Sequence, residues 1–165
     1  MTLWFRIPFL LGIAIAQSTL VPLVAIAGYK VDLALIAVVV EGLVGAPGTA
    51  AQSGFILGVF LDLTSGLPFG IHTLVLTLIG LLMDLGQAIF FRGNVVAPPI
   101  AMISATWVND VLILAILTLF NWPVDWTSDM LRVTLPAAIL NTLAMPLVYF
   151  PLRWLYRRTR PQLEV

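Results

Sequence analysis

An acid and a histidine separated by a turn are the residues in this sequence whose types suggest chemistry. Asp62 ends an apolar run, a turn rich in Gly, Pro and Ser follows, and His72 is the chain's one histidine, within GFILGVFLDLTSGLPFGIHTL. A carboxylate beside an imidazole can exchange protons, bind a charged ligand or hold a turn. In apolar surroundings an ionised carboxylate costs about 2.5–3.5 kcal/mol even on the lenient insertion scale, so Asp62 needs a partner.

The rest of the chain has the composition of an integral membrane protein. Of 165 residues, 61% are hydrophobic and 10% are charged, and the mean hydropathy is +1.07. A soluble domain carries about 25% charged residues. The formal charge is zero, which predicts no nucleic-acid partner, and the lack of cysteine excludes disulfides and thiol chemistry. The first apolar run is too long for a signal-peptide core, so we expect it to be a retained span.

Apolar runs separated by turn signals predict an all-α polytopic membrane protein, a single transmembrane domain over residues 1–165. Six transmembrane helices are expected, at about residues 3–26, 31–44, 49–63, 71–91, 95–120 and 131–155. The second and third reach only ~20 Å, against ~30 Å of hydrocarbon. Two interpretations stay open: short spans packed inside longer neighbours, which we favour, or one re-entrant hairpin. In the last helix, Pro136, Pro146 and Pro151 predict kinks.

The basic residues predict that both termini lie in the cytoplasm. With six spans, one side collects Arg6, Arg92, Arg153, Arg157, Arg158 and Arg160, and the other side has Lys30 and Arg132. Within the tail, RWLYRRTRP indicates a lipid-interface anchor made of Arg153, Trp154, Arg157 and Arg158. The alternative is that the tail acts as a topology signal alone.

Small residues mark one face of the third helix. Ala50, Gly54, Gly58 and Asp62 follow each other at four-residue spacing. Glycines at this spacing let two helix backbones approach closely. We expect this face to pack against a neighbouring helix of the same chain, and a homodimer contact is the alternative.

The expected role of Asp62 is a structural latch. Its carboxylate can accept hydrogen bonds from amides of the 65–70 turn or from the start of the fourth helix, where His72 can pair with it. Contact with a partner or ligand is the first alternative, and catalysis is the second. As a latch, Asp62 should tolerate replacement by Asn, which keeps an acceptor and the shape.

Three further acids, Glu41, Asp84 and Asp110, lie within the expected spans. We expect Glu41 and Asp84 to reach the inner interface. Asp110, beside Asn109, falls near the middle of the fifth helix, and Asn141 in the sixth can pair with it. These residues either line a polar cavity or form hydrogen bonds between helices, and both interpretations stay open.

No enzyme motif accompanies these acids. A lone histidine and the lack of cysteine argue against His-rich metal sites and Cys nucleophiles, and the sequence has no GxSxG and no phosphate-binding glycine loop. We therefore expect no catalysis, no metal and no cofactor.

The chain resembles a known family over nearly its whole length. VDLALIAVVVEGLVG and, most specifically, the pattern G-x-x-x-G-x-x-x-D-x-x-S-G-x-P-x-G-x-H from Gly54 to His72 resemble the rod shape-determining protein MreD. One departure is Val31 before Asp32, where the family usually has proline.

The resemblance implies a non-enzymatic subunit of the bacterial elongation machinery in the cytoplasmic membrane. Such proteins bind the scaffold MreC and work with MreB, RodA and a penicillin-binding transpeptidase in peptidoglycan synthesis. Their fold is similar to the six-helix substrate-binding subunits of energy-coupling factor vitamin transporters. That similarity supplies an alternative function, small-molecule binding, for which the outer segments offer His72, Trp122, Asp125 and Trp126.

Overall fold

The computed structural model describes residues 3–24, 29–89 and 97–159, and within these ranges the chain is helical without a β-strand. The ends expected at residues 26, 91 and 95 lie outside the described residues. The elements, in chain order, are α1 (Leu3–Thr19), a 3₁₀ turn η1 (Val21–Val24), α2 (Leu33–Val44), α3 (Thr49–Thr64), α4 (Ile71–Ile89), α5 (Ala97–Leu119), α6 (Trp126–Asp129), a π-helical turn η2 (Met130–Thr134) and α7 (Leu135–Thr159).

Helix α2 forms the centre of the bundle. The side chains from Ala34 to Val40 are completely buried, and α2 packs against α1, α3, α4, α5 and α7. A helix that is apolar on every side must be enclosed by other helices, which is what this sequence encodes. Its 12 residues extend about 18 Å. The second expected helix thus lies inside longer neighbours, whereas α3 keeps one open face, where Phe55 and Leu63 are more than half exposed.

Helix α1 ends earlier than the sequence predicted. It stops at Thr19 instead of near residue 26, and the turn Val21–Val24 follows. The hydroxyls of Ser18 and Thr19 bond to carbonyls in the preceding turn, and Pro22 disfavours a helical conformation at the residue before it. The expectation of one continuous helix to about residue 26 was wrong. The residues after Thr19 are still apolar, and the helix stop signals at Ser18, Thr19 and Pro22 were not taken into account.

The last helix begins five residues earlier than expected, at Trp126 instead of residue 131. Asp125 caps it, since its carboxylate accepts a hydrogen bond from the Ser128 amide at 3.2 Å. The π-helical turn Met130–Thr134 ends two residues before Pro136, whose ring would collide with the Arg132 carbonyl in a regular α-helix. The wider turn therefore lets helix continue through the proline.

Among the described residues, two helices are long and apolar enough to cross a membrane by length and composition. These are Ala97–Leu119, with 23 residues, and the continuous helical stretch Trp126–Trp154, with 29 residues. Only about a third or less of each apolar window is buried in the isolated chain, which suits contact with lipid.

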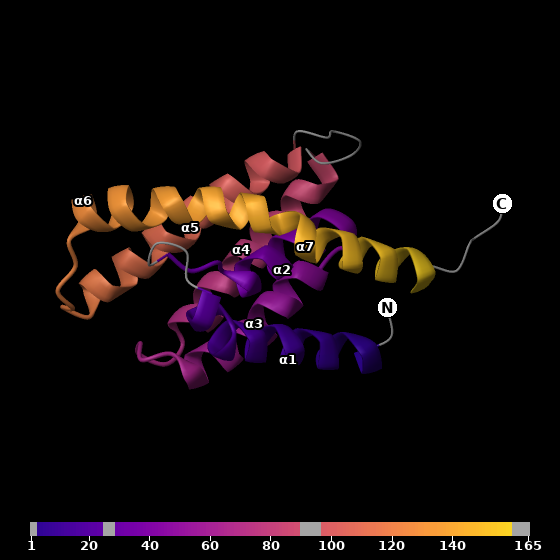
Figure 1. The fold of residues 1–165 in the computed structure, drawn as a ribbon, viewed down its shortest axis with the longest axis horizontal. Coiled ribbons are helices and arrows are strands. Elements are labelled where there is room, and N and C mark those ends of the chain that lie inside the picture. The colour runs from indigo at the N-terminus through magenta and orange to yellow at the C-terminus, as the bar shows by residue number, and fades with distance from the viewer. Residues whose placement is uncertain (1–2, 25–28, 90–96, 160–165) are drawn as a thin grey trace.

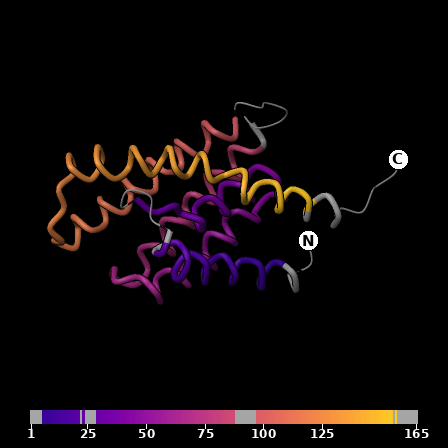
Figure 2. The backbone as a smooth tube through the Cα atoms, in the orientation of Figure 1, coloured from indigo at the N-terminus to yellow at the C-terminus, as the bar shows by residue number. Residues whose placement is uncertain are grey.

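The two ends of the chain's helical part lie on the same side of the bundle. Figure 1 shows the start of α1 and the end of α7 at the right, while the loop between α5 and α6 lies at the far left. Figure 2 traces the same path, with the turn between α3 and α4 also toward the left. Helices α1 and α7 thus run in opposite directions along the long axis.

Candidate functional site

Asp62 binds the first turn of α4 with both of its carboxylate oxygens. Oδ1 accepts the His72 amide at 2.9 Å and lies 3.1 Å from His72 Nδ1. Oδ2 accepts the Thr73 amide at 3.0 Å and the Thr73 hydroxyl at 2.5 Å. These amides are among the first four of a helix, which have no partner within it, and the positive end of the helix dipole favours the carboxylate. Of the two sets of donors that the sequence left open, the structure uses the start of α4.

Asp84 makes the reciprocal contact at the other end of the same helix pair. Its two oxygens accept the amides of Ala50 at 3.3 Å and Ala51 at 3.0 Å, in the first turn of α3. Asp84 therefore has a structural partner that the sequence did not identify, because α3 begins with unpaired amides directly beside it. Each helix of the α3–α4 hairpin thus carries an acid that caps the N-terminus of the other.

Between these two caps, the small-residue face of α3 lies directly against α4. A Cβ at Gly54 would overlap the Leu76 carbonyl, and one at Gly58 would overlap the backbone of Thr73. Ala50 is fully buried on the same face. The homodimer contact considered for this face has no room in the structure, because α4 already covers it.

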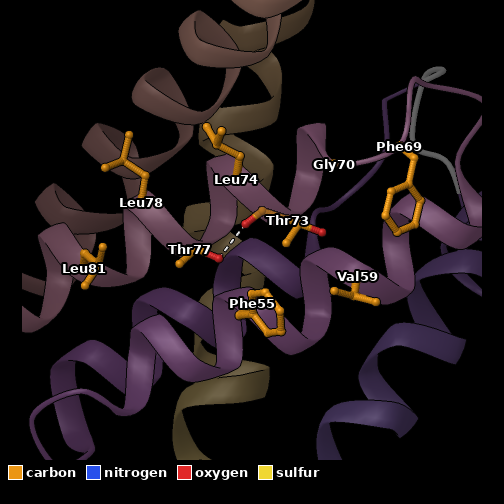
Figure 3. Close-up of a pocket in the computed structure, with 9 residues that line it drawn as sticks. All are labelled: Phe55, Val59, Phe69, Gly70, Thr73, Leu74, Thr77, Leu78 and Leu81. Carbon is orange, nitrogen blue, oxygen red and sulfur yellow. Dashed lines mark hydrogen bonds between the residues drawn. The ribbon is translucent and has the colours of Figure 1, made fainter.

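On its outer side, the same hairpin forms an apolar groove of about 560 Å³. Figure 3 shows Phe55 and Val59 on α3 and a row of leucines on α4, with Phe69 near one end. The full lining is Phe55, Val59, Phe69, Gly70, Thr73, Leu74, Thr77, Leu78 and Leu81. The Thr77 hydroxyl donates to the Thr73 carbonyl, so its polarity is satisfied within α4. The exposed surface of the groove is therefore apolar.

A buried ion pair joins α1 to α2 and α3. The Arg6 guanidinium donates to Glu41 Oε2 at 2.7 Å, to Ser53 Oγ at 2.7 Å, and to the Thr49 carbonyl, and Ser53 in turn donates to Glu41 at 2.5 Å. Arg6 is 5% exposed and Glu41 is 1% exposed. The expectation that Glu41 reaches the interface was wrong, because its partner arrives from α1 inside the bundle.

A second cavity, of about 220 Å³ and with polar walls, lies where α1, α2, α5 and α7 meet. Its lining comprises Gln17, Lys30, Val31, Asp32, Leu35, Thr106, Asn109, Asp110, Val133, Ala137 and Asn141. The structure thus brings together Asn109, Asp110 and Asn141, which the sequence singled out.

Hydrogen bonds within this cavity differ from the expected pairing. Asn141 accepts the Asp32 amide at 2.8 Å and donates to the Thr106 hydroxyl at 3.3 Å, while Asp110 accepts from Asn109 at 3.0 Å. Asn141 was expected to pair with Asp110. It bonds to the Asp32 amide at the start of α2 instead, one of the helix amides that have no partner within the helix.

The proposed lipid-interface residues are described in part. Arg153 and Trp154 are exposed, and the Arg153 guanidinium lies 5.6 Å from the centre of the Tyr149 ring and donates to its hydroxyl at 3.3 Å. The side chains of Arg157 and Arg158, and the residues Arg92 and Arg160, lie outside the described part of the chain. Within the described ranges, no group of three His, Cys, Asp or Glu side chains is arranged to hold a metal ion.

Several residues of these sites were not identified from the sequence. Ser53, Thr73 and Gln17 are ordinary polar residues on apolar helices, and their partners are far away in the chain. Arg6 could have been identified as a site residue because it is a charge inside a predicted span. In the sequence analysis it served only to predict which side of the membrane the N-terminus lies on.

Comparison with known proteins places this architecture in a family. No curated protein and no solved structure matched the chain. A family model described as rod shape-determining protein MreD matches residues 1–159. That span includes the α3–α4 hairpin with both of its caps, the groove and the polar cavity. The chain belongs to the MreD family and is a rod shape-determining membrane protein.

Proposed function

We propose that this protein is a non-enzymatic subunit of the bacterial cell-elongation complex, which binds the single transmembrane helix of the scaffold MreC and helps to organise peptidoglycan synthesis. MreB, RodA and a penicillin-binding transpeptidase are its further partners in this proposal. The observation that carries it is the apolar groove between α3 and α4. Family membership supplies the biological setting.

The groove suits a helix as its occupant. Within lipid there is no hydrophobic force between helices, so association depends on close packing at small residues and concave surfaces. Gly70 and two threonines line the floor, while Phe55, Leu74 and Leu81, each about half exposed, form the walls. The two acid caps hold α3 and α4 together at both ends, so the groove is preformed and a partner helix need not order it.

Site-specific cross-linking in cells that contain MreC tests this proposal. A photoreactive phenylalanine analogue at Leu78, in the groove, should cross-link to MreC, whereas the same analogue at Leu143 should not. Leu143 is the matched control because it is 71% exposed on α7, away from the groove. Leu78→Trp should fill the groove and reduce the MreC that co-purifies, while Leu143→Trp should not. Equal cross-linking from both positions would contradict the groove as the docking site.

The proposed arrangement in the bacterial cytoplasmic membrane has six spans with both termini in the cytoplasm, in a fold like that of the energy-coupling factor binding subunits. The placement of the α1 start and α7 end on one side of the bundle supports it. Arg6 forms an ion pair with Glu41, so it does not count as a free positive charge. The excess of basic residues on the proposed cytoplasmic side is therefore five against two.

Thiol labelling of intact cells tests this topology. A cysteine at Ser128 should react with a membrane-impermeant reagent, while cysteines at Thr2 and Pro161 should react only after the cells are opened. Labelling of either terminus in intact cells would overturn the topology.

The alternative function is that of a small-molecule binding subunit of an energy-coupling factor transporter. The polar cavity beside Asp32 and Asp110 favours it, since scaffolding requires no such cavity. Mass spectrometry of the purified protein separates the two functions. A retained vitamin-like molecule without MreC supports transport, and retained MreC without such a molecule supports the scaffold.

A further inference from the structure

The polar cavity between α1, α2, α5 and α7 contains charges of both signs that do not pair with each other. Lys30, Asp32 and Asp110 all line it. Within the described residues, Arg6 pairs with Glu41 and His72 contacts Asp62, and Lys30 forms no ion pair with either acid of the cavity. An acid within a membrane protein normally pairs with a nearby cation. Here the cation and the acids face a common space instead.

The walls of this cavity are built and held in place. Gln17 Oε1 accepts the Leu33 amide at 2.8 Å, and Asn141 Oδ1 accepts the Asp32 amide at 2.8 Å, so both carboxamides are anchored on the start of α2. Asp32 is fixed in turn, because its carboxylate accepts the Leu35 amide at 2.9 Å. Hence the polar side chains are oriented before any ligand arrives, which lowers the cost of binding.

Asn109 adds a carboxamide to the cavity wall. Asn109 is 5% exposed, and its amide nitrogen donates to Asp110 at 3.0 Å. Asn109 lines the cavity next to Asp110. Its carboxamide oxygen can therefore add an acceptor beside the two carboxylates.

From these contacts we infer that the cavity binds a small zwitterion, with a primary ammonium and an anionic group. The ammonium lies among Asp32, Asp110 and the Asn109 oxygen, which together accept its three donors. The anionic group lies toward Lys30, which is exposed at the mouth. A volume of about 220 Å³ equals that of about seven water molecules, which suits an amino acid or a phosphoethanolamine headgroup. This inference holds for either function proposed above.

Thermal melting of the full-length protein in detergent tests the inference. Phosphoethanolamine or alanine near saturation should raise Tm by about 5 °C. Ethanolamine and methyl phosphate, which each carry charge of one sign only, should raise it less. Lys30→Met and Asp110→Asn should each weaken binding about tenfold or more. Arg132→Met and Asp129→Asn, which change the same charges at residues that do not line the cavity, should not.

A second measurement, native mass spectrometry of protein purified from membranes, distinguishes a lipid headgroup from a free zwitterion. Retention of phosphatidylethanolamine in preference to phosphatidylglycerol, lost in Lys30→Met, would identify a lipid headgroup. Stabilisation by the soluble probes alone would identify a free zwitterion. Because Lys30 is exposed, Lys30→Met should fold even if Asp110→Asn does not. The inference would be overturned if neither zwitterionic probe stabilised the protein and neither lipid were retained in preference to the other. Binding that is unchanged in Lys30→Met would also overturn it.

Discussion

Replacing Asp62 by Asn should destabilise the protein, although the two side chains have the same shape. Each carboxylate oxygen accepts one backbone amide, from His72 and from Thr73. Asn has a single acceptor oxygen, so whichever way it is turned, its amide group faces one of these donors. We therefore expect Asp62→Asn to lose more stability than the sequence alone suggested.

The size of the effect follows from counting amides without an acceptor. A buried donor left unsatisfied costs about 1–3 kcal/mol. The His72 side chain is 18% exposed, so some water reaches this turn and the lower part of that range applies. We expect about 1–2 kcal/mol for Asp62→Asn, with one orphaned amide, and about 2–4 kcal/mol for Asp62→Leu, with two. Thermal shifts of about 2–8 °C and 4–16 °C follow for a chain of this size.

The assay is thermal unfolding in detergent, followed by tryptophan fluorescence, with Asp125→Asn as the matched control. Asp125 also accepts a helix amide, but a single exposed one, and Asn caps helices as well as Asp does, so its Tm should change by less than about 2 °C. If Asp62→Asn melted like this control, the two-oxygen contact would be refuted. If it melted like wild type yet abolished rod shape, the charge would serve a partner instead.

Three further outcomes follow from the same contacts. Asp84→Asn should lower Tm about as much as Asp62→Asn, and the effects should add in the double variant, because the caps lie at opposite ends of the hairpin. Gly58→Leu should abolish monodisperse expression by size-exclusion chromatography, whereas Gly12→Leu, with open space around it, should not. Arg6→Met should cost about 3–5 kcal/mol by leaving Glu41 buried without a cation, and Glu41→Leu in the same chain should restore most of the lost Tm.

The sequence alone determined the class of protein and most of its helices. Long apolar runs interrupted by Gly, Pro and charged residues are local signals, so α3 and α4 begin at the residues predicted and α2 ends where predicted. The pattern from Gly54 to His72 was also local, and it sufficed to identify the family that the match over residues 1–159 established.

Tertiary structure decided which polar groups meet. Glu41 finds Arg6, 35 residues away, and Asn141 finds Asp32, 109 residues away. No spacing rule reaches so far, because such pairing depends on how the helices cross in space. In an apolar bundle each buried polar group takes the nearest unpaired donor or acceptor. Only the packing of α1, α5 and α7 around α2 determines which one that is.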